Sequence, residues 1–261
     1  MSEENPQNKD LIISKKFAIA QDICGALAFI LAIVQGITLI ISAKSFLVIA
    51  GVILIVEYIS SHCKSYFFDK GHRLREIGLI DNSFNEKRIP NYNSEPYYSN
   101  SSISPEEIKL LANIHENSLF TSRIAEKMSF PYYLFSAVAF LFFIIKLFII
   151  KLFMSGMDDY SSLLLSFIVS SSLFDRAIKL NSLKKASEEV YGKSNEICNT
   201  YEKFPVKTNM FLPQIMEVLL LYENAIFESK IILSERIFYE LNSALSKEWQ
   251  DIRDRYLIYK C

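Results

Sequence analysis

One segment of the chain combines side chains that could bind a small phosphorylated ligand carrying aromatic bases. Four cations suited to phosphate groups lie at Arg73, Arg75, Lys87 and Arg88. Rings that could stack on bases and amides that could bind base edges accompany them, at Phe84, Tyr97, Tyr98, Asn82, Asn93 and Asn100. Small-nucleotide sites use this combination of cations, aromatic faces and amides. The alternative is structural, with arginines at a membrane surface and tyrosines packed against helices.

Catalytic signatures are absent from the sequence. It contains no glycine-rich phosphate loop and no GxSxG motif. The three histidines, His62, His72 and His115, show neither HExxH nor Cys-pair spacing for zinc. The pair Asp158 and Asp159 is expected to be a solvated turn. The sequence therefore predicts no enzyme, no metal and no cofactor.

Composition narrows the class of protein. Of 261 residues, 51% are hydrophobic and 13% aromatic, which excludes a disordered chain. The net charge of -1 excludes a strongly basic binder of DNA or RNA polymers. Four cysteines in a chain of this length are too few for a disulfide scaffold. A membrane protein with a soluble part, or an unusually apolar soluble protein, remains.

Four apolar runs favour the membrane protein. Residues 23–43 carry no charge and would form a helix of about 31 Å, the thickness of a bilayer core. A second run begins at residue 45 and meets its first charge at Glu57, a third covers 129–157, and a fourth covers 160–174. We predict four spans in two helical hairpins. The alternative is two spans with two buried or interfacial helices.

The flanking cations orient these spans. Lys and Arg gather before the first span, between the second and third, and after the fourth, at Lys9, Lys15, Lys16, Lys64, Lys70, Arg73, Arg75, Arg123, Lys127, Arg176, Lys179, Lys184 and Lys185. The hairpin tips offer only Lys44 and Lys151. By the positive-inside rule, both termini and the central segment are expected to be cytoplasmic.

Small and polar residues within the spans are candidates for helix packing or for a pore. Small residues recur every four positions in the first span and in the fourth, at Ala28, Ala32, Gly36, Ser162, Ser166 and Ser170. Such spacing lets helices approach closely; the sharper interpretation is that the serine face lines an aqueous path in an oligomer. Gln35, Glu57 and Lys146 are polar groups at or near membrane depth. Such groups usually face protein or water, although the last two could instead snorkel to the interface.

The predicted fold is an all-α integral membrane protein. Its parts are an N-terminal cytoplasmic segment (1–22), two transmembrane hairpins (23–61 and 129–174), a cytoplasmic insert (62–128) and a helical cytoplasmic region (175–261). In the insert, Ser104, Pro105 and Glu107 predict a capped helix start, followed by the buried stripe Ile108, Leu111, Ala112, His115 and Leu119. In the C-terminal region the fourth span is expected to continue as a helix toward Pro205. Further helices are predicted from Pro213, with Ile215, Val218, Leu219, Tyr222 and Ile226 on one face, and along 233–256.

Three motifs of the central region add a family resemblance. They are an acidic-Ser-Phe stretch in IDNSF (80–84), a Tyr-Tyr-x-Asn in SEPYYSN (94–100) and a Glu-Asn-Ser in IHENSLF (114–120). Together with the layout of two spans, insert, two spans and helical tail, they resemble the SMODS-associating four-transmembrane effector family. The chain has Asn82 where that family is expected to have a second acid, and Asn85 and Pro96 where glycines are expected.

The resemblance implies a function. Proteins of that family are encoded beside a nucleotidyltransferase that makes a cyclic oligonucleotide on phage infection, in the bacterial system called CBASS. The effector is thought to bind this messenger and disrupt the inner membrane, which kills the infected cell. We therefore expect a homo-oligomer in the bacterial inner membrane that binds a cyclic di- or trinucleotide. A constitutive channel or transporter, and a membrane-anchored scaffold using the 233–256 stripe, remain alternatives.

Overall fold

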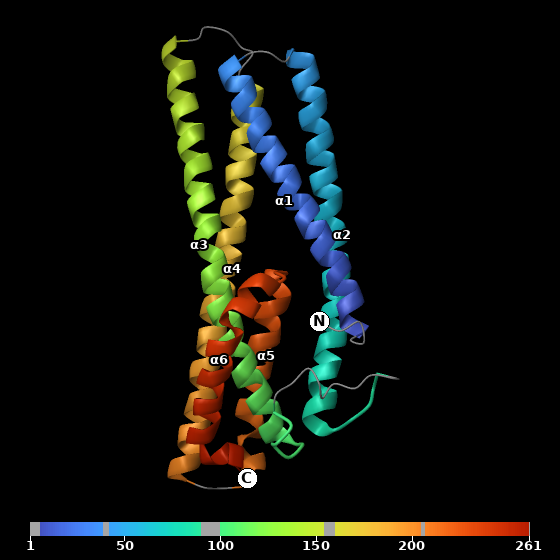
Figure 1. Cartoon of the computed structure of the whole chain (residues 1–261), viewed down its shortest axis with the longest axis vertical. Helices are drawn as coiled ribbons and strands as arrows, with labels where there is room; N and C mark the ends of the chain where they lie inside the picture. Colours follow the sequence, from blue (N-terminus) through green and yellow to red (C-terminus); the bar gives the residue numbers. More distant parts are fainter. Residues whose placement is uncertain (1–5, 39–41, 90–99, 154–159, 205–206, 261) are drawn as a thin grey trace. The chain divides into compact units, whose positions relative to one another are not determined.

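The computed structural model describes residues 6–38, 42–89, 100–153, 160–204 and 207–260, and the regular elements in them are all helical. Figure 1 shows four long helices, α1 (Pro6–Thr38), α2 (Ala43–Phe84), α3 (Glu107–Phe153) and α4 (Tyr160–Lys203). Shorter elements follow: η3 (Thr208–Phe211), α5 (Leu212–Ser229), α6 (Glu235–Arg255) and η4 (Leu257–Lys260). The predicted all-α class is confirmed for these residues.

Four helical segments are long and apolar enough to cross a membrane: Lys9–Val34, Lys44–Phe84, Glu107–Phe148 and Thr208–Ser229. The second contains predicted span two, and the first and third overlap predicted spans one (23–43) and three (129–157) in part. The fourth differs from the prediction, which placed the last span at residues 160–174. That stretch lies at the start of α4, where several side chains are outside the described part of the chain. Its role as a span therefore stays a prediction.

The apolar character of Thr208–Ser229 has an explanation in packing. Within α5, Ile215, Val218 and Tyr222 are at most 2% exposed and belong to a hydrophobic core shared with other helices. The helix also carries Glu223, which is buried in an ion pair. A helix whose apolar face is covered by protein gains nothing from lipid, so we treat α5 as a bundle helix.

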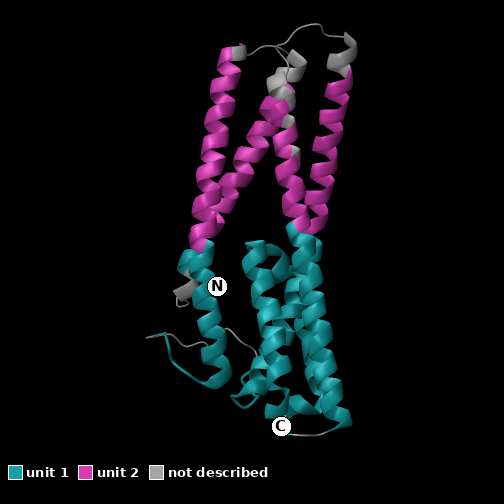
Figure 2. Cartoon of the chain, turned by 180° about the vertical axis from the view of Figure 1, so that it is seen from behind, with its two compact units in different colours: residues 1–11, 68–128, 179–261 teal, residues 12–67, 129–178 magenta. Residues whose placement is uncertain are grey.

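Only part of each long helix can lie in a bilayer. With 42 and 47 residues, α2 and α3 are about 63 and 70 Å long, whereas the hydrocarbon core is about 30 Å thick. The chain divides into two compact units (Figure 2): unit 1 is 1–11, 68–128 and 179–261, and unit 2 is 12–67 and 129–178. The apolar runs of the sequence fall in unit 2.

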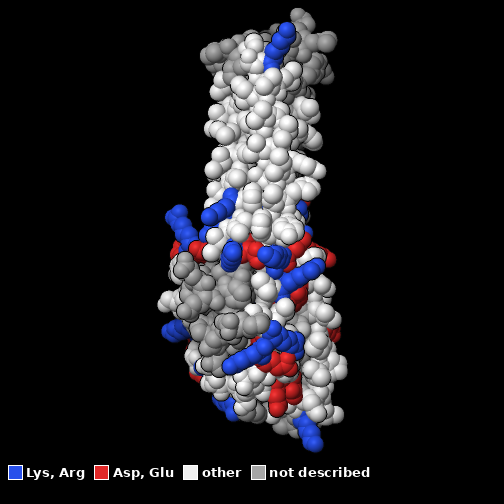
Figure 3. Space-filling model, turned by 90° about the vertical axis from the view of Figure 1, so that its right-hand side faces the viewer, with Lys and Arg blue, Asp and Glu red and all other residues white. Residues whose placement is uncertain are grey.

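The surface of unit 2 is that of a lipid-exposed protein. Most of the face of unit 2 in Figure 3 carries no charged residue. Large apolar side chains stand on its surface at more than half exposure, among them Val48, Ile55, Phe135, Leu141 and Leu164. An apolar surface of this extent is not stable against water and fits contact with lipid chains.

All four long helices contribute to the packing inside unit 2. Ala28 and Ala32 of α1 are fully buried in a cluster with Phe46 of α2 and Leu165 of α4. Ring contacts bring in α3, since Phe142 lies against Phe29 and Phe143 lies against Phe167.

Unit 1 has a core of its own, built on the stripes that the sequence predicted. The α3 stripe Ile108, Leu111, Ala112, His115 and Leu119 is at most 7% exposed throughout. It packs with Leu79 of α2, Val190 of α4, Ile215 of α5 and Trp249 of α6. The prediction of helices near Pro213 and along 233–256 is confirmed by α5 and α6.

The helix ends show where local sequence signals succeeded and where one failed. Gly192 lies inside α4, which runs unbroken to Lys203, as predicted. The predicted capping box is wrong: α3 begins at Glu107, two residues late, and the Glu107 carboxylate accepts a hydrogen bond from Thr208 Oγ1 (2.8 Å). The Glu107 carboxylate thus binds Thr208, which is distant in the sequence, instead of the backbone at the start of its own helix.

The backbone at the end of α2 accounts for the asparagine at position 85. Asn85 adopts a left-handed conformation with φ 55° directly after the helix. The Glu86 N–H then donates to the Asp81 carbonyl (2.9 Å), which closes a Schellman-type cap. Asparagine tolerates this conformation better than other residues with a side chain, so it serves at a position where glycine was expected.

Candidate functional site

The predicted ligand residues form two groups in unit 1. Arg73, Phe84, Lys87 and Arg88 are exposed. Arg75, Asn82 and Asn100 are largely or fully buried and bind protein groups. Asn93, Tyr97 and Tyr98 lie outside the described residues.

Asn82 and Asn100 belong to a buried network of hydrogen-bonded side-chain amides. Asn113 of α3 donates through Nδ2 to Asn82 Oδ1 (3.0 Å), and Asn100 Nδ2 donates to Asn113 Oδ1 (3.0 Å). Asn100 also donates to Glu116 Oε2 (2.8 Å) and accepts from Trp249 Nε1 (3.1 Å). Buried amides are stable only when bonded in this way. Asn82 and Asn100 therefore connect α2, α3 and α6 rather than face a ligand, and we withdraw them from the ligand set.

Arg75 is paired with a buried carboxylate of the same unit. Its guanidinium forms an ion pair with Glu223 of α5 and lies 5.7 Å from the centre of the Tyr222 ring. The Tyr222 hydroxyl in turn lies 2.9 Å from Thr121 Oγ1 of α3. Releasing Arg75 to a phosphate would leave Glu223 charged and buried, which is costly. We withdraw Arg75 from the ligand set as well.

A second buried network surrounds His115. Its Nδ1 lies 2.9 Å from the Tyr259 hydroxyl, to which Cys198 Sγ also donates (3.3 Å). Burial lowers the pKa of His115 to about 3 and raises the pKa of the Cys198 thiol to about 12. The pKa of Tyr259 is likewise raised by burial. All three groups are neutral at physiological pH, so they hold the core together and offer neither a thiolate nor a charged base.

Three of the exposed predicted residues, Phe84, Lys87 and Arg88, lie at the turn after α2, whereas Arg73 lies about three helical turns earlier on α2. The N–H groups of Arg88 and Ile89 donate to the buried Asp81 carboxylate (3.0 and 3.4 Å), which fixes the backbone of this turn. The Arg88 guanidinium forms an ion pair with Glu86 at the surface. Lys87 and Phe84 are exposed beside it. This turn is the part of the predicted site that a soluble ligand can reach.

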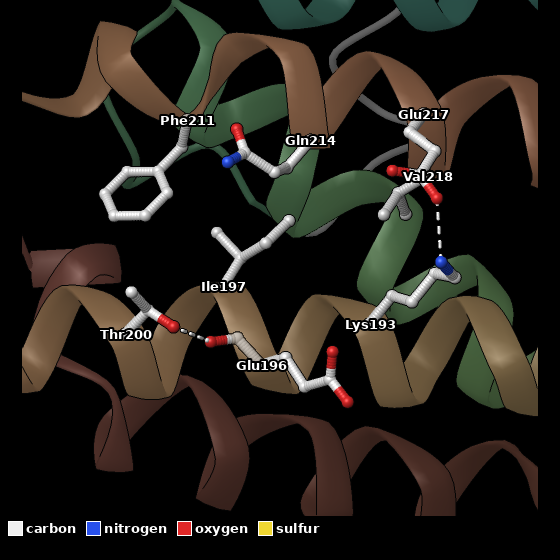
Figure 4. Close-up of a pocket in the computed structure, with 8 residues that line it drawn as sticks. All are labelled: Lys193, Glu196, Ile197, Thr200, Phe211, Gln214, Glu217 and Val218. Carbon is white, nitrogen blue, oxygen red and sulfur yellow. Dashed lines mark hydrogen bonds and ion pairs between the residues drawn. The ribbon is translucent and has the colours of Figure 1, made fainter.

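A small groove between α4 and α5 does not suit the predicted ligand (Figure 4). Its volume is about 180 Å³, below the roughly 300 Å³ of ordinary ligand pockets. Lys193 Nζ donates to Glu217 Oε1 (2.7 Å) across it, and Glu196 adds another negative charge. The other lining residues are Ile197, Thr200, Phe211, Gln214 and Val218. An anion would meet two carboxylates and a lysine that is already paired.

In unit 2, the predicted packing residues are described only in part. Ala28 and Ala32 are fully buried between helices. The side chains of Gln35, Gly36, Ser162, Ser166 and Ser170 lie outside the described part of the chain. The serine-lined path therefore stays a prediction.

Lys146 and Glu57 differ in environment. Lys146 is 6% exposed, and its Nζ donates to the Ala32 carbonyl (3.2 Å) of α1. It lies 5.8 Å from the centre of the Phe142 ring. The lysine is thus turned toward protein, as the first interpretation expected, and does not snorkel. Glu57 is half-buried.

Potential metal ligands meet at one place among the described residues: His72 and Glu76 of α2 with Glu223 of α5. Local sequence motifs predicted no metal site. The four-residue spacing of His72 and Glu76 was visible, but the third group lies on a helix far along the chain. Asn113 and Trp249 of the amide network were missed for the same reason.

Comparisons with known protein families, with curated proteins and with solved structures found no match to this chain. The family resemblance therefore rests on the three sequence motifs and the layout of the spans.

Proposed function

We propose that the chain is an effector of the bacterial inner membrane that binds a cyclic oligonucleotide and then permeabilises the membrane. The observation that carries this proposal is helix continuity. Each of α2, α3 and α4 contributes residues to the apolar unit 2 and to the bundle of unit 1 without a break in the helix. A change in the packing of the bundle is thereby transmitted along stiff elements to the spans.

The proposed topology follows from charge. The spans form two hairpins, and unit 1, with both termini, is cytoplasmic. Lys and Arg residues are concentrated in the segments that flank the apolar runs on this side. A cytoplasmic messenger would then reach unit 1 directly.

The proposed ligand surface is the turn after α2. Lys87 and Arg88 supply positive charge at this turn and Phe84 supplies a ring, while Arg73 adds a cation earlier on α2. Tyr97 and Tyr98 stay predicted ligand residues and lie outside the described part of the chain. An incoming phosphate would compete with Glu86 for Arg88. Because this pair is exposed, the competition costs little.

The energetic requirement on the messenger can be stated. To move a sealed and an open state from 1:99 to 99:1, it must bind the open state about 10⁴-fold more tightly, a difference of about 5.5 kcal/mol. Oligomerisation through unit 1 would supply additional differential contacts.

The test is dye release from liposomes that carry the purified chain, against a panel of cyclic di- and trinucleotides. We expect one member of the panel to trigger release. Replacing Lys87 and Arg88 together by alanine should weaken that response, because both side chains are exposed and contribute charge rather than packing. The matched control is the double replacement of Lys247 and Arg236, which are exposed on α6, and it should respond like the wild type.

Other outcomes identify the alternatives. Release without any nucleotide would indicate a constitutive channel. A sealed membrane with saturating ligand bound, and a chain that remains monomeric, would refute the effector and favour a scaffold.

A further inference from the structure

A cluster of three potential metal ligands joins two helices of unit 1. His72 and Glu76 lie one turn apart on α2, and Glu223 lies on α5. His72 Nε2 is 3.3 Å from Glu76 Oε1 and 3.7 Å from Glu223 Oε2. In a tetrahedral site with metal–ligand bonds of about 2.0–2.1 Å, the ligand atoms are about 3.3 Å apart. All three ligand atoms lie within 4.8 Å of one another, close enough to share one small cation.

His72 gives independent evidence for a ligand. The residue is 2% exposed, and neither ring nitrogen forms a hydrogen bond within the described structure. Phe68 stacks on the ring at 5.8 Å and Phe227 lies at 5.7 Å, so the imidazole is held in place by apolar contacts. Buried polar groups without a hydrogen bond are rare and need an explanation. A cation held by Nε2 would satisfy this nitrogen.

The protonation state of His72 suits metal binding. Burial, followed by the charge of Arg75, lowers its pKa to about 4, against a smaller opposing effect of Asp69. The ring is therefore neutral at physiological pH, which is the form that binds metal ions. A neutral ring also means that no imidazolium offsets the carboxylates beside it.

The charge balance around the ring leaves an excess of negative charge. Glu223 binds Arg75 through Oε2, while its Oε1 is buried without a hydrogen bond. Among the described residues paired at this cluster, the carboxylates of Asp69, Glu76 and Glu223 stand against the cations of Arg75 and Lys230. A bound cation would offset this excess.

We propose that His72, Glu76 and Glu223 bind one zinc ion, which fastens α2 to α5. One imidazole and two carboxylates form a donor set of intermediate softness, which is typical of zinc. Manganese, a harder ion that prefers oxygen ligands, is the ion for comparison. Three protein ligands leave a fourth position for water. The proposal does not depend on the ligand or the activity assigned to the chain.

The experiment uses the full chain, purified in detergent and freed of metal by chelation. Calorimetric titration with Zn²⁺ should give one ion per chain, and Co²⁺ as a probe should give the intense visible absorption of a tetrahedral site. H72Q and E76Q should each weaken zinc binding by more than about 100-fold, beyond the range usual for loss of an outer-shell partner. The matched control is H62Q, the same change at an exposed histidine of the same helix, which should bind like the wild type.

E76Q keeps the test decisive if H72Q fails to fold, because Glu76 is 42% exposed and its replacement leaves the core intact. Equal zinc affinity of E76Q and the wild type would overturn the proposal. An equal loss in H62Q, or an octahedral Co²⁺ spectrum, would do the same.

Discussion

The amide network predicts a large loss of stability on replacing Asn100 by alanine. Trp249 Nε1, buried with its indole at 2% exposure, would lose its acceptor, at a cost of about 1–3 kcal/mol. Loss of the two bonds that Asn100 donates to Asn113 and Glu116 adds about 0.5–1.5 kcal/mol each. The expected decrease in the free energy of unfolding is therefore about 2–6 kcal/mol, a large part of the roughly 5–15 kcal/mol of a typical domain.

The chain offers its own reporter for this measurement. Trp249 is the single tryptophan, so its fluorescence during denaturant unfolding in detergent reports directly on the altered site. Asn209 is an exposed asparagine in η3, and its replacement by alanine should change the free energy of unfolding by less than about 0.5 kcal/mol. The two variants share the chemistry of the change and differ in burial.

Two results would refute the reasoning. The first is a stability of N100A within the range of the Asn209 control. The second comes from a double-mutant cycle of N100A with W249F, followed by circular dichroism. We expect a coupling of about 0.5–3 kcal/mol between bonded residues, and a coupling of zero would mean that the indole does not bind the amide.

Three further predictions follow from burial. Arg75→Met should lower the free energy of unfolding by about 3–5 kcal/mol, because Glu223 is left charged and buried; adding Glu223→Gln should recover part of this loss, and chemical denaturation measures both. In the unfolded chain, His115 takes up a proton as the pH falls below its ordinary pKa of 6.5. In the folded chain, burial lowers the pKa of His115 to about 3, so the proton is taken up only at much lower pH. Stability should therefore fall as pH decreases through this window, by about 1.4 kcal/mol per pH unit for this group, and H115F should flatten the profile. Ala32→Leu should destabilise unit 2 by about 1–3 kcal/mol in thermal unfolding, since the alanine is fully buried between helices.

The sequence was most informative where burial repeats along a helix. The Ile108–Leu119 stripe of α3, the start of α5 near Pro213 and the course of α4 as far as Lys203 all followed from local pattern. In these cases the period of the apolar residues indicates the buried face of the helix, and the position of proline indicates where a helix begins or ends.

The sequence was least informative about polar side chains. An asparagine that reads a base and an asparagine that closes a buried network have the same chemistry, and only the partner differs. For Asn82 and Asn100 the partners are Asn113 on α3 and Trp249 on α6, and for Arg75 the partner is Glu223 on α5. Such long-range pairs leave no periodic trace, so the predicted ligand set mixed core residues with surface residues.

The unbroken course of α3 constrains how the chain can change in length. Exposed apolar residues such as Phe135 and Leu141 and core residues such as Leu111 and Leu119 lie on one continuous helix. A single residue inserted near residue 128 would rotate one set against the other by about 100° and advance it by about 1.5 Å. An insertion of seven residues would restore the phase to within about 20° while lengthening the helix by about 10 Å. Length variation at this junction is therefore expected in steps of two helical turns, whereas the connection between α5 and α6 is free of this constraint.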